Sequence, residues 1–122
     1  MRENNAIHHM SQAFAERVVN LCKHLQRTYK YDYIIETMAK QMLRAGTSIG
    51  ANVRESKAAQ STADFVSKLK IALKEGDESA YWLELMHKTD YLEDNDFSSI
   101  YSDNKRINVT LVKIINSILG NR

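Results

Sequence analysis

The chain has 122 residues, of which 43% are hydrophobic and 26% are charged, with no proline, four glycines and one cysteine. This length fits one ordinary domain, and the absence of proline argues against a turn-rich sandwich, a barrel or a disordered tail. Seventeen Lys and Arg against fifteen Asp and Glu give a net charge of +2, which is too balanced for general polyanion binding but allows a local basic face.

The first predicted element is a helix over residues 5–28. Its apolar side chains recur at helical spacing and fall within an arc of about 100°. They are Ile7, Met10, Phe14, Val18, Leu21, Leu25 and Tyr29. We expect His8 and His9 to be mobile and Cys22 to be a small core filler. Asp32 then supplies the N-cap of the next helix.

The second predicted helix covers residues 33–57. Its buried stripe repeats at three- and four-residue spacing and comprises Ile34, Met38, Met42, Ala45, Ile49 and Val53. Gly46 and Gly50 lie inside this helix, where each glycine costs about 1 kcal/mol relative to alanine. They indicate either close backbone packing or a local weakness.

The third predicted helix covers residues 62–88, and Ser61 with Asp64 resembles a capping box at its start. Its stripe is close to a heptad seam and comprises Phe65, Leu69, Ala72, Gly76, Ala80, Leu83 and His87. We expect His87 to be a partly buried histidine with a satisfied hydrogen bond.

The fourth predicted helix covers residues 97–119 and ends at Gly120. Its stripe comprises Phe97, Ile100, Asn104, Ile107, Leu111, Ile114 and Ile118. Short connections between long helices favour antiparallel neighbours. The sequence therefore predicts an all-α fold, with residues 1–122 forming a single up-down-up-down four-helix bundle.

Some apolar side chains lie outside the predicted core stripes. They are Val19, Trp82, Val112, Ile115 and Leu119. Such residues indicate a subunit interface of a homo-oligomer, or they are isolated hydrophobic residues on the surface.

Motifs for catalysis, metal binding and nucleotide binding are missing from the sequence. The four histidines lack metal-ligand spacing, and there is no phosphate-binding glycine loop, so we expect no metal, no cofactor and no enzymatic activity. No run of 18 apolar residues and no signal-peptide core occur. We therefore expect a cytoplasmic protein without a membrane span.

A polar stripe follows the apolar one in the second helix and comprises Arg44, Ser48, Asn52 and Glu55. Asn52 should be half-buried. Such groups need hydrogen-bond partners, either across the bundle or from a neighbouring subunit.

Basic residues are the candidates for nucleic-acid binding. They are Arg54, Lys57, Lys68, Lys70, Lys74 and Lys88. Tyr81 shares an outward helix face with three of these lysines, so an aromatic ring lies among cations. A solvated helix face, with Asp77 and Glu78 nearby, explains the same pattern. Ring symmetry would make several copies of a modest patch act together on a polyanion.

Two runs carry a resemblance to a known family. The run QMLRAGTSIGANVRE at residues 41–55 and the run FVSKLKIALKE at residues 65–75, the latter followed by Glu78 and YWLEL at residues 81–85, resemble the bacterial 23S rRNA intervening-sequence proteins. The resemblance spans roughly residues 12–119. Gly50 and Ser56 stand where many relatives have proline and glycine.

The resemblance implies a small bacterial cytoplasmic protein that forms a ring-like homopentamer without enzymatic activity. It also places Glu78 with the polar stripe among the family's motif residues. A similar bundle is the accessory protein of diversity-generating retroelements, which binds a reverse transcriptase and nucleic acid through a basic surface.

Our leading hypothesis is a non-enzymatic homo-oligomer that binds RNA or DNA through symmetric basic faces and could act as an accessory to a nucleic-acid enzyme. The alternative is a protein-interaction scaffold with no nucleic-acid role, in which Trp82 and the last helix dock a partner.

Overall fold

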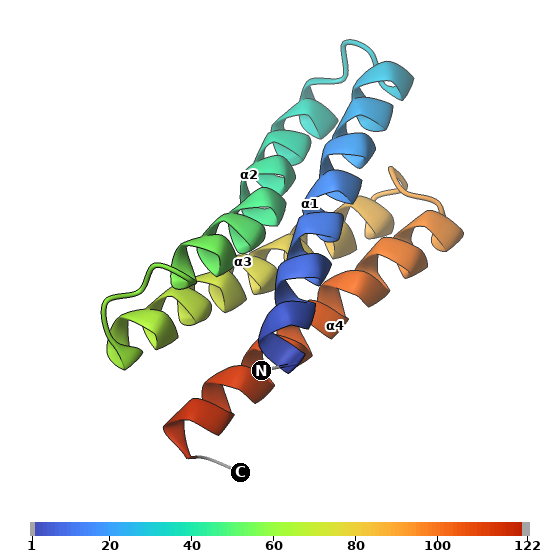
Figure 1. Ribbon diagram of the computed structural model, residues 1–122. Coiled ribbons are helices and arrows are strands. Elements are labelled where there is room, and N and C mark those ends of the chain that lie inside the picture. Colours follow the sequence, from blue (N-terminus) through green and yellow to red (C-terminus); the bar gives the residue numbers. More distant parts are fainter. Residues whose placement is uncertain (1, 121–122) are drawn as a thin grey trace.

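The computed structural model describes the backbone of residues 2–120 and the side chains of residues 5–120. It contains four α-helices, namely α1 (Arg2–Thr28), α2 (Tyr33–Ser56), α3 (Thr62–Lys88) and α4 (Asp94–Leu119). Figure 1 shows successive helices running in opposite directions. The predicted all-α, up-down-up-down four-helix bundle is therefore confirmed. Residue 1 and residues 121–122, the ends of the expected domain, lie outside this description.

Each helix packs against the next one in the chain, and α4 closes the bundle by packing against α1. The α1–α2 and α3–α4 turns lie toward one end of the bundle, whereas the α2–α3 turn, the start of α1 and the end of α4 lie toward the other (Figure 1). This topology decides which charged segments come together, because residues at matching ends become neighbours whatever their separation in sequence.

The predicted N-caps of α2 and α3 are confirmed. The carboxylate of Asp32 accepts hydrogen bonds from two backbone amides in the first turn of α2, at 3.0 and 3.1 Å. The hydroxyl of Ser61 accepts one from the Asp64 amide at 3.0 Å. The Asp64 carboxylate accepts from the Gln60 amide at 3.2 Å, one residue before the position used in a standard capping box.

The helix bounds differ from the expected ones mainly at N-termini. Helix α1 begins at Arg2, before the expected residue 5, and α4 begins at Asp94, before the expected residue 97. Asp94 and Asp96 lie in the first turn of α4, where the positive end of the helix dipole favours carboxylates. Gly120 ends α4 in the left-handed conformation, with φ 77°.

The buried apolar side chains largely follow the predicted stripes, with an error at the start of α2. Ile34 is 59% exposed, whereas Ile35 is 2% exposed. With 100° between successive residues, Ile35 lies closer than Ile34 to the centre of the arc formed by Met42, Ile49 and the other buried residues of α2. Ile35 therefore replaces Ile34 in the core.

The interior glycines lie where helices approach closely. A Cβ atom at Gly46 would stand 2.7 Å from Cγ2 of the fully buried Val18, and one at Gly50 would stand 3.3 Å from the backbone oxygen of Ser11. Helix α2 stays continuous through both glycines and through Ser56. Of the two interpretations of these glycines, close backbone packing is therefore the one that the structure supports.

Two asparagines of α4 form a polar layer against α3. Nδ2 of the fully buried Asn104 donates to the backbone oxygen of Gly76 at 3.0 Å. Nδ2 of Asn108 donates to Asp77 at 3.4 Å, and its Oδ1 lies 2.1 Å from where a Cβ atom at Gly76 would stand. The absence of a side chain at Gly76 therefore makes room for Asn108.

The contact at Gly46 predicts a steric effect on stability. Gly46→Ala should lower the free energy of unfolding by about 1–3 kcal/mol, because Val18 is β-branched and cannot turn away. This value is the net change, after the gain of about 1 kcal/mol from the better helix propensity of alanine. Urea unfolding of the single variants and of the Gly46→Ala, Val18→Ala double variant measures the coupling. Equal or higher stability of Gly46→Ala would contradict the close contact.

Candidate nucleic-acid interface

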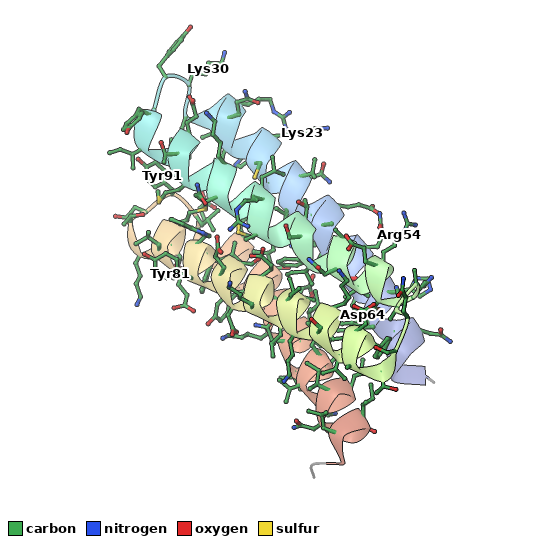
Figure 2. The ribbon with its side chains drawn as sticks, turned by 90° about the vertical axis from the view of Figure 1, so that its left-hand side faces the viewer. Lys23, Lys30, Arg54, Asp64, Tyr81 and Tyr91 are labelled. Carbon is green, nitrogen blue, oxygen red and sulfur yellow. The ribbon has the colours of Figure 1, made fainter. Side chains whose placement is uncertain are left out.

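The end of the bundle at the α2–α3 turn gathers most of the candidate cations. We call it the basic end and define it by Arg54, Lys57, Lys68, Lys70 and Lys74, a group that extends from the last turn of α2 to the middle of α3. Figure 2 shows Arg54 and Asp64 near this end, with Lys30 and Tyr91 near the other. Residues 54–74 hold five Lys or Arg side chains and two carboxylates. The net charge of this segment is therefore positive.

The cations of the basic end differ in their surroundings. Lys68 is held by Glu55, with Nζ 3.4 Å from the carboxylate, so part of its charge is neutralised within the protein. Lys70 and Lys74 are exposed one turn apart and flank a shallow hollow on the outer face of α3 that also includes Ile71. These two lysines present charge to solvent beside apolar surface.

Lys88 does not join this group. It is the last residue of α3, about 30 Å from Lys68 at a rise of 1.5 Å per residue. The turn that follows, residues 90–96, holds four carboxylates and neither Lys nor Arg. The sequence predicted that Lys88 shares a helix face with Lys70 and Lys74, but it did not reveal that Lys88 lies beside an acidic turn.

A hollow between α1 and α2, of about 680 Å³, brings histidines to the basic end. We call it the His8 hollow; its polar lining includes His8, His9, Gln12, Thr47, Arg54 and Lys57. Burial, and then the positive charges of Lys57, Arg54 and His9, hold the pKa of His8 below its usual value.

Sequence reasoning missed this hollow and treated both histidines as mobile, whereas the structure places them on α1. The predicted antiparallel pairing of the first two helices would have been enough to find the hollow. In an antiparallel helix pair, residues equally far from the connecting turn face each other, as Ser11 and Gly50 do. The same pairing places His8 beside the last turns of α2.

The polar stripe connects α2 with α3 through Arg44. Its guanidinium donates to the Glu75 carboxylate at 3.1 Å and also to Glu78. The hydrogen bond from Arg44 holds the pKa of Glu78 below its usual value. The indole N–H of Trp82 donates to the same Glu78 carboxylate at 3.2 Å. These four side chains form one network on the α2–α3 surface.

The rest of the stripe also finds partners within the chain. Ser48 donates to the backbone oxygen of Arg44 at 2.6 Å, and the half-buried Asn52 donates to that of Ser48 at 2.9 Å. Glu55 pairs with Lys68 of α3. The stripe therefore needs no neighbouring subunit to satisfy these groups, and the expected half-burial of Asn52 is confirmed.

The expected exposure of the interface candidates needs correction at two positions. Ile115 is only 6% exposed, and Trp82 is half-buried against the core. Ile115 lies only 40° around α4 from the buried Leu111, and the Trp82 ring is long enough to reach the core from the edge of α3. The remaining candidates are Val19, Val112 and Leu119, which are 36%, 41% and 49% exposed.

Cys22 and His87 both have structural partners. Cys22 Sγ lies 3.5 Å from the backbone oxygen of Ala39, and burial raises the pKa of the thiol to about 11. Such a thiol is a poor nucleophile at neutral pH. The half-buried His87 contacts Asp94 at 2.8 Å and stacks on Phe97 with a ring separation of 4.1 Å.

Among the side chains that the structure describes, no group of three or more His, Cys, Asp or Glu residues could hold a metal ion. None of the helices within residues 2–120 combines the length and the apolar character needed to cross a membrane.

Comparison with known proteins identifies the family. The model of the family "23S rRNA-intervening sequence protein" matches residues 3–113. A crystal structure of a protein with unknown function from the S23 ribosomal protein family of Bacteroides thetaiotaomicron is similar in fold, with a TM-score of 0.87. The two chains are 47% identical over an alignment that covers 93% of this chain and 98% of that chain. No curated protein matches the chain. The family match covers most of the bundle, including both sequence runs noted above, and the chain therefore belongs to the 23S rRNA-intervening sequence protein family.

Proposed function

We propose that the protein binds RNA as a non-enzymatic homo-oligomer, with the basic end of each subunit contacting the phosphate backbone. The observation that carries this proposal is the uneven distribution of charge along the bundle. The net charge is only +2, yet residues 54–74 hold five cations and two carboxylates, whereas residues 90–96 hold four carboxylates and neither Lys nor Arg. A polyanion is attracted to the first of these two segments and repelled by the second. The family name, which refers to 23S rRNA, favours RNA over DNA.

Assembly is supported by two apolar surfaces on different sides of the bundle. Val19 lines a hollow of about 650 Å³ between α1 and α2. Val112 lies one helical turn after Asn108, which contacts Asp77, so Val112 belongs to the α3 side of α4. Leu119 lies two turns further along the same side. In a bundle in which each helix packs on the next, the α1–α2 side is opposite the α3–α4 side.

A twofold axis pairs a surface only with its own copy, so a contact between these two different surfaces would be head-to-tail. Such contacts close into a ring when the rotation between subunits is a simple fraction of a turn. Five copies are the number that the family resemblance implies. A ring presents several basic ends to one polyanion, so modest attraction at each end adds up.

The resemblance to the retroelement accessory protein adds a partner to this proposal. A reverse transcriptase or another nucleic-acid enzyme would share the RNA or DNA with the ring and contact its protein surface. Under this proposal the protein positions nucleic acid and leaves the chemistry to its partner.

A protein-interaction scaffold is the second candidate function, and the exposed aliphatic side chains of α4 favour it. Val109, Val112 and Leu119 are large, apolar and 41–56% exposed. A scaffold that uses this surface would capture its partner equally well after Arg54→Glu and Lys57→Glu, but not after Val112→Glu.

The affinity for a fluorescently labelled RNA hairpin should fall as salt rises from 50 to 200 mM. The logarithm of the association constant should fall linearly with the logarithm of the salt concentration, because the lysine and arginine side chains displace counterions from the RNA. The Arg54→Gln, Lys57→Gln variant should bind more weakly, and its salt slope should fall by about 1 for each phosphate contact removed. Lys88→Gln with Arg27→Gln is the matched control, since it also removes one exposed lysine and one exposed arginine, but from the end of the bundle that holds the α1–α2 and α3–α4 turns. Absent binding at low salt, or equal losses in both variants, would refute the proposed site.

Val112→Glu should dissociate the homo-oligomer, because a buried unpaired carboxylate at a subunit contact is costly. Light scattering coupled to size exclusion should then give the mass of one subunit, with an unchanged helical circular dichroism spectrum. Ser102→Glu adds the same charge at another exposed position of α4 and should leave the mass unaltered. A monomeric parent protein would contradict the proposed assembly.

A further inference from the structure

The His8 hollow concentrates groups that can donate to an anion. Arg54 reaches it from the last turn of α2 and Lys57 from the residue that follows this helix, while His8 and His9 reach it from α1. Gln12 and Thr47 add neutral polar side chains to its lining. The lining as described contains no carboxylate. These cations therefore have no internal counter-charge within the hollow itself.

The hollow also has the size and shape for an anion that remains attached to a larger molecule. Its volume of about 680 Å³ is open to solvent along the α1–α2 surface, and its lining includes the small residues Gly50 and Ala51. Gly50 packs against the backbone of Ser11, which holds α1 and α2 close together beneath the charged side chains. A chain-like polyanion can lie along such an opening.

We infer that the His8 hollow binds a phosphodiester group of the RNA backbone through Arg54, Lys57 and the protonated ring of His8, and that this binding tightens as pH falls below 7. The inference rests on the proposed RNA-binding function and specifies where and under which conditions a phosphate is held. Arg54 and Lys57 supply permanent charge, whereas His8 adds a third charge only when it takes up a proton.

The surroundings of His8 determine the sign of this pH dependence. The charged groups that face it are His9 from α1, Arg54 from α2 and Lys57, which follows α2, and each of them lowers the pKa of His8. The side that faces α3 contributes Phe65, which carries no charge, and α4 lines neither hollow that contains His8. In the free protein, burial and these cations hold the pKa of His8 below its usual value, which favours the neutral ring.

A bound phosphate reverses this balance. Its negative charge offsets Lys57 and Arg54, so the pKa of His8 must be higher in the complex than in the free protein. By linkage, affinity is greatest below the pKa of the free protein, falls as pH rises toward the pKa of the complex, and is constant above it. One proton taken up by His8 limits the effect to about tenfold per pH unit.

Titration of the labelled RNA hairpin at pH 5.5 and pH 7.5, at one ionic strength, tests the inference. The parent protein should bind at least threefold more tightly at the lower pH, and His8→Gln should remove this difference while keeping the salt-dependent binding at pH 7.5. His24→Gln is the matched control, because His24 is an exposed histidine near the other end of α1. It should behave like the parent protein.

The outcomes separate this inference from the proposed function. If His8→Gln keeps the full pH dependence, the His8 hollow is not the site, while salt-dependent RNA binding still stands. If the parent protein binds no RNA at either pH, the proposed function fails and the inference fails with it. Thermal unfolding of His8→Gln checks that the variant remains folded.

A second measurement does not depend on a substitution. The NMR resonance of the His8 ring Cε1–H group, assigned by its absence in His8→Gln, reports the pKa of His8 directly. This pKa should rise when the RNA hairpin is added at saturation. An unchanged His8 pKa in the complex would overturn the inference even if the affinity itself varies with pH.

Discussion

The close approach of α1 and α2 is the constraint on which the rest of the structure depends. At Gly50 a Cβ atom would stand 3.3 Å from the backbone oxygen of Ser11, so the two helices approach more closely here than a side chain at this position would comfortably allow. This contact fixes the register of the pair as well as its spacing. The register then decides that His8, from the second turn of α1, stands beside Arg54 and Lys57. The geometry of the His8 hollow is thus a consequence of helix packing rather than of a local sequence motif.

Polar contacts of two buried asparagines determine the register of the α3–α4 pair. Asn104 is fully buried and donates to the backbone of Gly76, and Asn108 lies over the same glycine. A buried donor without a hydrogen bond costs free energy, so a shift of α4 by one turn that broke the bond from Nδ2 of Asn104 to Gly76 would be unfavourable. The apolar stripes alone tolerate such a shift, because one turn of a heptad seam resembles the next. The asparagines therefore select one register from several that have similar apolar burial.

Most of the fold could be predicted from the sequence, because helical periodicity and capping residues are local properties. The sequence could not predict where the buried face of each helix ends, because that limit depends on the neighbouring helix. Ile35 replaced Ile34 because the arc is centred on its side of α2. Ile115 is buried because α3 covers more of α4 than a narrow stripe implies, and Trp82 is half-buried because Glu78 accepts its indole N–H while the ring packs inward. The apolar pattern of one helix predicts which face of that helix is buried, but it does not predict how wide the buried face is.

The candidate cations could each be identified from the sequence, but their grouping follows from topology. Lys88 shares a helix face with Lys74 and yet lies beside carboxylates, whereas His8 and Arg54 are distant in sequence and share a hollow. A ring built through the sides of the bundle, with its symmetry axis along the helices, would bring all basic ends to one rim. Like charges held within a Debye length of about 8 Å repel one another, and a bound polyanion relieves that repulsion. Assembly and RNA binding would then stabilise each other. Each subunit added to the ring raises the attraction for RNA, and bound RNA lowers the electrostatic cost of adding a further subunit.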